Sequence, residues 1–176
     1  VIRRAIDMMC ERALSRRTKG ELLADKQMSQ EKIADAYTMM MQYRLHVLYT
    51  AWLIDKHKED NREVRKEIAA IKAATPKVLV EIVSRAMHLH GSLGSSDETP
   101  LANMWANIPE LGVGDGPTEV HKVAVAKAVR RNDSAHDALF PSYHTPTQRA
   151  KALEKYGHFL PSSERDRPGL MSVGGA

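Results

Sequence analysis

Apolar and polar positions alternate with a helical period over most of the first 131 residues. In residues 1–17, Ile2, Ile6, Met9 and Ala13 recur every three to four positions among charged residues. This spacing predicts an amphipathic helix. We expect Gly20 to cap its C-terminal end, because glycine readily adopts the left-handed conformation found there.

Two longer helices are expected next. The second helix runs from about Ser29 to Asp55, and its apolar residues form one continuous stripe, namely Ile33, Tyr37, Met41, Leu45, Leu48 and Trp52. A polar turn over residues 56–61 precedes a third helix, expected from about Asn61 to Leu89. Pro76 lies inside that helix and should kink it, because proline lacks the ladder donor and clashes with the preceding turn.

A last strong helix is expected from Pro117 to about Arg131, with proline at the first helical position. Helices of this length joined by short turns predict an all-α fold, an antiparallel four-helix bundle over residues 1–131. Residues 132–176 carry four prolines and form an irregular, partly helical tail. We expect a short helix over Thr147–Tyr156 and a loose end at 172–176.

Composition narrows the class of protein. A chain of 176 residues can bury the core of one compact domain, and 5% aromatics with nine methionines favours helix packing. The formal charge of +4 is mixed along the chain, and no dense basic stripe interleaved with aromatics is present. Nucleic acid is therefore the less favoured partner. The positive charge is equally compatible with a basic groove that binds a phosphorylated cofactor or a CoA ester.

Cys10 is the only cysteine, which excludes a disulfide framework and a cysteine zinc site within the chain. It favours a reduced, intracellular compartment, either cytoplasm or an organelle matrix. No apolar run approaches the roughly 18 residues of a membrane span, and the first residues lack the pattern of a signal peptide. The chain starts without Met inside a helical pattern, which suggests a fragment of a longer protein.

The segment Gly112-Val-Gly-Asp-Gly-Pro-Thr-Glu-Val-His121 is the strongest candidate for chemistry. It places Asp115 between two glycines at the entrance of the last helix. One interpretation is an N-cap aspartate that closes this helix. The other is a general base, because a carboxylate on a bare turn can approach a ligand and take a proton from a carbon acid.

A second glycine turn, His88-Leu-His-Gly-Ser-Leu-Gly94, lies twenty residues earlier. Together the two turns suggest a single site.

His88 and His90 are two positions apart at a helix end and point in different directions. No Glu-x-x-His pair is present, so we expect no metal site.

Arg16 and Arg17 form a basic pair at the end of the first helix. Such a pair can be a solvated helix C-terminus that interacts favourably with the helix dipole. It can also bind a pyrophosphate, because a guanidinium contacts phosphate oxygens through two parallel hydrogen bonds. Residues alone leave both interpretations open.

As a set, these segments resemble the C-terminal helical domain of acyl-CoA dehydrogenases. Residues 13–27 resemble the family's Arg-x-x-Phe-Gly … Gln segment, and 86–94 its Gln-x-x-Gly-Gly-x-Gly turn. Residues 98–101 are similar to the segment after that turn, and 114–121 to the Glu-Gly-Thr-Ser-Glu loop. The Asp-Gly-Pro-x-Glu-Val-His version is most similar to the large-protein branch of the family.

The resemblance implies an FAD site shared between subunits. Arg16 matches the arginine that reaches the FAD pyrophosphate of the neighbouring subunit, and Gln27 matches the glutamine beside it. Residues from His88 through Gly91 to Ser92 match the turn that packs against the same FAD.

The resemblance also implies the catalytic loop. Asp115 matches the base that takes the α-proton of an acyl thioester while hydride leaves the β-carbon for FAD. Gly116 would lie along the thioester, and Thr118 and Glu119 match contacts to the subunit's own FAD.

The chain departs from the family pattern at several of these positions. The base is Asp where most of the family has Glu, which shortens its reach by roughly 1.5 Å, enough to matter for proton transfer. His88 stands for the family's Gln and Ser92 for its second turn glycine. Lys19 replaces a phenylalanine, and residues 106–107 are Ala-Asn in place of an Arg-Asp pair.

Two functions from different classes follow. The first is the C-terminal domain of an FAD-dependent acyl-CoA dehydrogenase, assembled as a homodimer or homotetramer with acyl-CoA as substrate. The N-terminal and middle domains of the family are absent from this sequence, so we expect the isolated chain to retain no FAD and to be inactive. The second is a non-catalytic helical scaffold that mediates oligomerisation. A basic nucleic-acid binder, with steeply salt-dependent affinity, is a weaker third interpretation.

Overall fold

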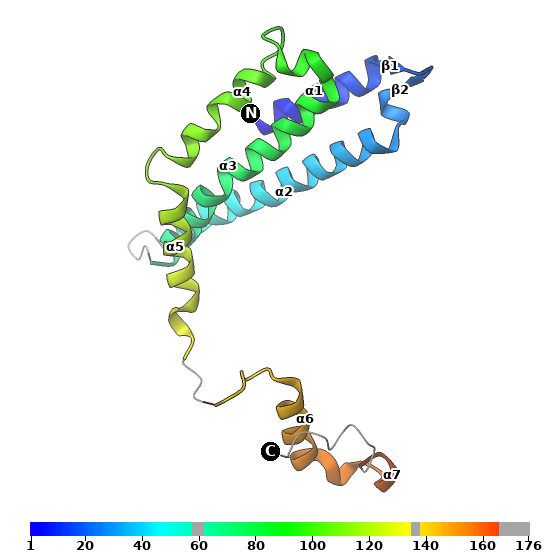
Figure 1. Cartoon of the computed structure of the whole chain (residues 1–176). Coiled ribbons are helices and arrows are strands. Elements are labelled where there is room, and N and C mark those ends of the chain that lie inside the picture. The colour runs from blue at the N-terminus through cyan, green and yellow to red at the C-terminus, as the bar shows by residue number, and fades with distance from the viewer. Residues whose placement is uncertain (58–61, 135–137, 166–176) are drawn as a thin grey trace. The chain divides into compact units, whose positions relative to one another are not determined.

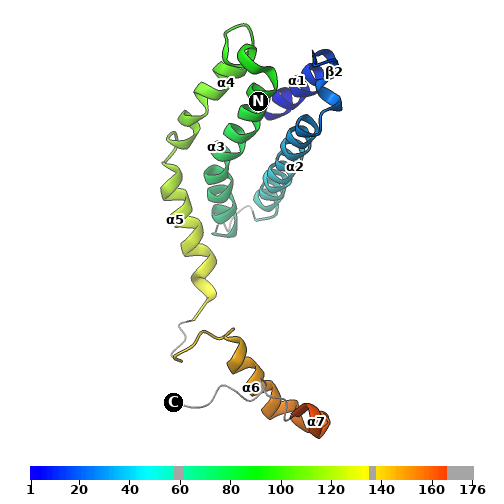
Figure 2. The same cartoon turned by 45° about the vertical axis from the view of Figure 1, so that its right-hand side comes forward.

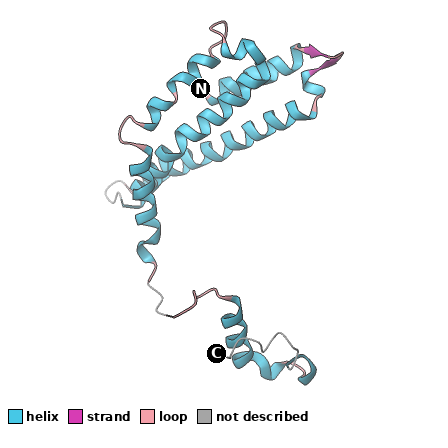
Figure 3. Ribbon diagram, in the orientation of Figure 1, coloured by secondary structure: helices cyan, strands magenta, loops and turns pink. Residues whose placement is uncertain are grey.

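A computed structural model of the chain describes residues 1–57, 62–134 and 138–165. The chain divides into two compact units, Val1–Arg131 and Asn132–Ala176. The first unit holds the helices that carry all the candidate site residues. Its secondary structure is almost entirely helical (Figure 3).

Three helices of the first unit follow one another in alternating directions. They are α1 (Ile2–Ser15), α2 (Gln27–Lys56) and α3 (Arg62–His90). Contacts between α2 and α3 show the antiparallel arrangement, because Asp35 binds Arg85 near one end and His46 binds Glu67 near the other. Figures 1 and 2 show α3 between α2 and the later helices.

The fourth position of the bundle is filled by a broken helix. It consists of α4 (Leu101–Asn107), the 3-10 turn η3 (Pro109–Gly112) and α5 (Thr118–Val129). This series runs antiparallel to α3, since the Trp105 indole nitrogen donates to Ser84 at 3.0 Å and Gly112 lies beside Pro76. The four-helix bundle is confirmed, and the structure adds α4 and η3 to its fourth member.

The core lies where α1, α2, α3 and α4 meet. Its fully buried members include Met9 of α1, Ile82 and Val83 of α3, and Leu101 of α4. Each large apolar side chain removed from water contributes roughly 1.5–3 kcal/mol to folding. Cys10 is half-buried and packs at the edge of this cluster.

Gly20 is not a helix cap, and that prediction was wrong. Helix α1 ends at Ser15 with Arg16 as its extended C-cap. Two short antiparallel strands follow, β1 (Arg17–Thr18) and β2 (Glu21–Leu22), joined by Lys19 and Gly20 with φ of 52° and 84°. Positive φ at both central residues is typical of a two-residue hairpin turn. The turn therefore uses glycine for a hairpin, not for a helix end.

The apolar stripe of α2 is only partly buried. Tyr37, Leu45, Leu48 and Trp52 are each about half exposed, whereas Ala36, Met40 and Leu53 of the same helix are buried. The 14 residues of α1 span about 21 Å and the 30 of α2 about 45 Å. Much of α2 therefore has α3 on one side and no second helix of this unit to cover the stripe.

Helix α3 continues through Pro76 as one assigned element. Proline cannot supply the backbone donor at this position. Beside it, the Thr75 hydroxyl donates to the Ile71 carbonyl at 2.8 Å and meets the Tyr43 hydroxyl at 2.6 Å. These side-chain bonds tie the proline turn to α2. The polar turn expected at 56–61 lies largely outside the described residues.

The second unit contains α6 (Thr145–Tyr156), the 3-10 turn η5 (Gly157–Phe159) and α7 (Ser162–Arg165). Helix α6 begins two residues earlier than the sequence predicted. Pro146 is the reason, because proline suits the first turn of a helix. His144, the N-cap residue, stacks on Phe140 at 4.2 Å between ring centroids. The expected loose end at 172–176 lies outside the described residues.

Across both units, no helix in the described part of the chain is long and apolar enough to cross a membrane.

Candidate functional site

The predicted site residues form two groups that lie apart in the bundle. The first surrounds η2 (Gly91–Ser95), directly after α3. The second occupies the loop 112–118, whose Gly112 lies against Pro76 in the middle of α3. Fourteen helical residues lie between Pro76 and Gly91, which is about 20 Å along the axis. The prediction that the two turns form one site is therefore wrong for a single chain.

The first group gathers at one end of the bundle. Arg16 ends α1, Gln27 begins α2 and His88 lies in the last turn of α3, followed by Gly91 and Ser92. The Leu23 N–H donates to the Arg16 carbonyl at 2.9 Å, which ties the connection before α2 to the end of α1. All five residues are exposed. They can therefore be reached by a ligand or by another subunit.

The η2 turn is shaped by two glycines with different tasks. Gly91 has φ of 66°, and a Cβ there would meet nothing within 4 Å. Gly94 is buried, and a Cβ there would lie 2.5 Å from the Met87 carbonyl oxygen and 2.7 Å from its Cα. The first glycine allows the chain to reverse, and the second allows two backbone segments to touch. The Thr99 hydroxyl also donates to the Leu93 carbonyl at 3.2 Å.

The second group is held by hydrogen bonds around Asp115. Asp115 and Gly116 have φ of 55° and 102°. The His121 Nε2 donates to the Asp115 carbonyl at 3.2 Å, and the Thr118 hydroxyl donates to the Gly112 carbonyl, also at 3.2 Å. The loop is thus clamped to the first turn of α5 on both sides of Asp115.

Asp115 is not the N-cap of α5. That position belongs to Pro117, and no side-chain cap hydrogen bond is made there. A left-handed conformation costs roughly 1–2 kcal/mol for an ordinary residue, and aspartate tolerates it better than most. The Asp115 side chain is exposed, and it makes no hydrogen bond or ion pair within the described residues. The carboxylate is therefore free to meet a ligand.

Gly116, Thr118 and Glu119 follow on the same loop and helix start. A Cβ on Gly116 would lie 3.1 Å from the His121 Nε2. Thr118 is half-buried and Glu119 is exposed in the first turn of α5. An acidic residue in a first helical turn interacts favourably with the helix dipole.

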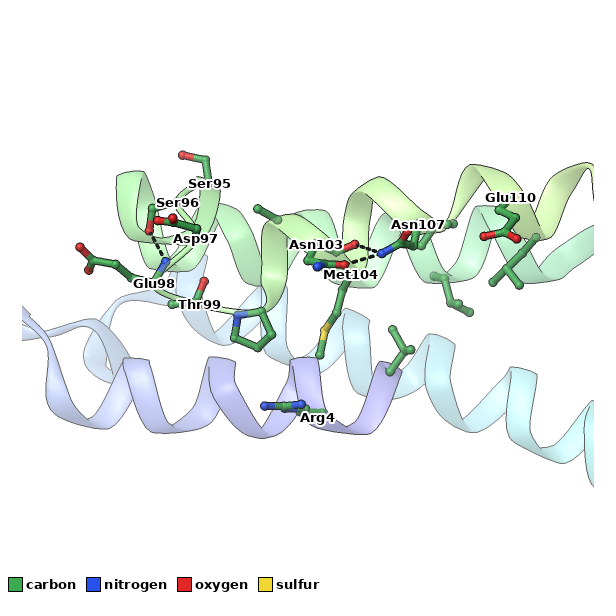
Figure 4. A pocket seen from close by; sticks show the side chains of 16 residues that line it. Arg4, Ser95, Ser96, Asp97, Glu98, Thr99, Asn103, Met104, Asn107 and Glu110 are labelled. Atoms are coloured by element: carbon green, nitrogen blue, oxygen red, sulfur yellow. Dashed lines mark hydrogen bonds between the residues drawn. The ribbon is translucent and has the colours of Figure 1, made fainter.

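A large hollow of the described surface lies elsewhere. It has a volume of about 930 Å³ and lies between the start of α1 and α4 (Figure 4). Asp97, Glu98 and Arg4 lie along it, and the Glu98 N–H donates to the Ser96 hydroxyl. None of the predicted site residues lines this hollow.

Two residues beside these turns, His121 and Arg12, were not singled out by sequence reasoning, and His90 was considered only as a metal ligand. His121 was seen only as part of a motif, yet it binds the carbonyl of Asp115. The Arg12 Nε is buried without a partner, and the His90 ring is 8% exposed. Spacing could have hinted at Arg12, because it precedes Arg16 by one helical turn. Among the described residues, no group of three or more His, Cys, Asp or Glu could hold a metal ion.

Comparison with known proteins gives the family of this chain. The family model "Acyl-CoA dehydrogenase, C-terminal domain" matches residues 1–130. Acyl-CoA dehydrogenase family member 11 of Rattus norvegicus is 40% identical over 124 residues, covering 70% of this chain and 16% of that protein. (R)-Benzylsuccinyl-CoA dehydrogenase of Thauera aromatica is 36% identical over 124 residues, covering 70% and 30%.

Solved structures have the same fold. Butyryl-CoA dehydrogenase from Megasphaera elsdenii superimposes with a TM-score of 0.67 at 20% identity, covering 73% of this chain and 32% of that one. Glutaryl-CoA dehydrogenase from Mycobacterium smegmatis gives 0.68 at 18% identity, covering 77% and 34%. The chain spans 16% and 30% of the length of the two relatives from Rattus norvegicus and Thauera aromatica. It belongs to the acyl-CoA dehydrogenase family and is similar to the C-terminal domain of that family.

Proposed function

We propose that the complete protein is an FAD-dependent acyl-CoA dehydrogenase, with acyl-CoA as substrate and Asp115 as the catalytic base. The observation that carries this proposal is the conformation of Asp115. A non-glycine residue is held at φ of 55° with an exposed, unbonded carboxylate, while its backbone is fixed by His121. Strain of this kind persists only where surrounding contacts enforce it and is frequent at functional sites.

The chemistry assigned to this loop is proton abstraction. The Asp115 carboxylate takes the proton from the α-carbon of the thioester, and Gly116 leaves room for the thioester because it has no side chain. FAD, when bound, supplies the hydride acceptor for the β-carbon. A trans double bond between the α- and β-carbons results.

The residues at both turns fit FAD. Arg16 offers an exposed guanidinium for phosphate oxygens, and Gly91 leaves open space beside the chain. With Gln27, His88 and Ser92, these residues would hold the FAD of a neighbouring subunit. Thr118 and Glu119 would contact the subunit's own FAD. The 20 Å between the two groups supports an arrangement in which each group serves a different FAD.

The same proposal implies an assembly. Acyl-CoA dehydrogenation would require the family's remaining domains, and we expect a homodimer or homotetramer inside the cell. The half-exposed stripe of α2, with Leu45, Leu48 and Trp52, supports burial against another surface. Residues 1–131 would form the bundle domain and 132–176 a separate tail.

Substitution of Asp115→Asn in the complete protein tests the base. The change keeps the size of the side chain and removes the basic oxygen. We expect kcat/KM for acyl-CoA to fall by about 10²–10⁴-fold, while Asp115→Glu, which restores the family's commoner residue, retains activity. Asp97→Asn, an exposed aspartate away from the loop, should leave the rate unchanged.

A non-catalytic scaffold is the second candidate, and the exposed apolar stripe of α2 favours it. An unchanged dehydrogenation rate in Asp115→Asn would remove the base role, and a complete protein without any such activity would support the scaffold. Visible absorbance of the purified 176-residue chain with added FAD gives a separate test. Stoichiometric bound flavin would contradict our expectation that this chain alone does not complete the cofactor site.

A further inference from the structure

One arginine of the bundle has a buried nitrogen without a hydrogen-bond partner. The Nε of the half-buried Arg12 on α1 is excluded from solvent, and no hydrogen bond or ion pair satisfies it within the described residues. A buried donor without an acceptor is costly, so such groups are normally paired. Arg12 therefore has hydrogen-bonding capacity left for a ligand.

Arg85 provides the comparison within the same bundle. Its side chain is 24% exposed, and it contacts Asp35 at 3.0 Å and Glu81 at 2.9 Å. Within the described residues, Arg85 thus has two carboxylate partners and Arg12 has none.

Arg12 lines a pocket of about 240 Å³ between α1 and the η2 turn. Ser15, His90 and Thr99 line it as well, and Glu11 lies at its rim. The Ser15 and Thr99 hydroxyls donate to the Arg12 and Leu93 carbonyls, so their protons are already used. The exposed Glu11 is solvated, and its repulsion of an anion is screened by salt. Arg12 is thus the principal donor of the pocket.

His90 adds an acceptor. Its Nδ1 lies 2.8 Å from the Ala86 carbonyl oxygen, which can only accept, so Nδ1 carries a proton. The neutral ring then has a lone pair on Nε2, which has no partner in the described residues. A ligand for this pocket should therefore accept hydrogen bonds from Arg12 and offer one to His90.

We propose that this Arg12 pocket binds the phosphate group of inorganic phosphate or of a phosphate monoester. Such a group has oxygens for the guanidinium and, when singly protonated, an O–H for His90. The diphosphate of FAD has no ionisable O–H of this kind, so the pocket is additional to the FAD contacts proposed for Arg16. Phosphate binding in this pocket does not require the dehydrogenase activity.

Calorimetric titration of the purified 176-residue chain with inorganic phosphate at pH 8 tests the proposal. We expect saturable one-to-one binding, a dissociation constant at least tenfold higher in Arg12→Gln, and little change in Arg17→Gln. Arg17 is an exposed arginine that contacts the Gly20 carbonyl outside the pocket. The proposal would be refuted if no saturable binding were found, or if both substitutions weakened phosphate binding equally.

Further ligands and a spectroscopic measurement keep the test decisive. At pH 8 methyl phosphate, whose second pKa is about 6, and sulfate both lack a proton to donate, so both should bind more weakly than inorganic phosphate. Equal binding of sulfate would contradict the role of His90. If Arg12→Gln fails to fold, phosphate should still shift the His90 ring resonances in the NMR spectrum of the unaltered chain, and unshifted resonances would refute the proposal.

Discussion

The η2 turn and the loop 112–118 are both rich in glycine, but their glycines solve different problems. At η2, buried Gly94 lets the chain touch the Met87 backbone. In the loop, Gly116 has φ of 102° and the residue before it, Asp115, is itself left-handed. A threonine hydroxyl closes each turn at 3.2 Å.

Gly94 at η2 therefore allows close packing, whereas the glycines of the loop 112–118 help to hold the Asp115 side chain in a fixed position. A turn that depends on close backbone contact belongs to the core and contributes mainly to stability. A loop that holds an exposed carboxylate in a left-handed conformation sacrifices some stability to fix that group in space. Substitution of Gly94 should therefore mainly affect folding, whereas substitutions in the loop 112–118 should affect activity as well.

Gly94→Ala should have the largest effect on folding. The new methyl group would lie 2.5–3.0 Å from backbone atoms of Met87, which cannot rotate away. We expect a loss of about 3 kcal/mol or more in the free energy of unfolding, measured by urea denaturation of the chain. Ser95→Ala, at an exposed neighbouring position, serves as the control. A Gly94→Ala protein as stable as the unaltered chain would refute the close backbone contact.

Gly116→Ala should come next. The substitution places a Cβ at φ of 102° and 3.1 Å from the His121 ring. We expect a loss of about 1–3 kcal/mol in stability, together with reduced acyl-CoA turnover in the complete protein. Retained turnover with normal stability would show that the loop does not need this conformation.

Gly91→Ala measures the cost of backbone strain without a steric clash. Its φ is 66°, but a Cβ there meets nothing within 4 Å, so we expect a smaller loss of about 1 kcal/mol. Gly157 also has open space around a Cβ, at φ of −58°. Gly157→Ala should therefore cost nothing or stabilise slightly. If Gly91→Ala and Gly157→Ala behave alike in thermal unfolding, the left-handed strain at η2 is unimportant.

Thr118→Val and Thr99→Val should have the smallest effects on stability, and together they compare the two turns directly. Each removes one hydroxyl bond of 3.2 Å that spans six residues, and each should lower stability by about 0.5–1 kcal/mol. We expect Thr118→Val to reduce acyl-CoA turnover in the complete protein more than Thr99→Val does, because it loosens the loop that carries Asp115. Equal loss of activity in both variants would erase the distinction between the turns.

The local pattern of apolar residues was sufficient to predict the long helices but not the conformation of the turns. The helical period located α2 and α3 to within two residues at each described boundary, because long amphipathic segments repeat their signal many times. The hairpin at Lys19–Gly20 was missed, since two-residue strands carry no period and glycine serves helix ends and hairpins alike. No helix was predicted at the position of α4.

The sequence by itself determined the family, the bundle and the residue types at both turns, because these depend on motifs and periodicity along one chain. Tertiary structure alone decided that the two turns lie apart and that much of the α2 stripe is exposed. It also decided that, in the described part of the chain, the Arg12 Nε has no partner while Arg85 has two. Each of these depends on which helix faces which and how far it extends. That information resides in packing between segments distant in sequence, which no local pattern encodes.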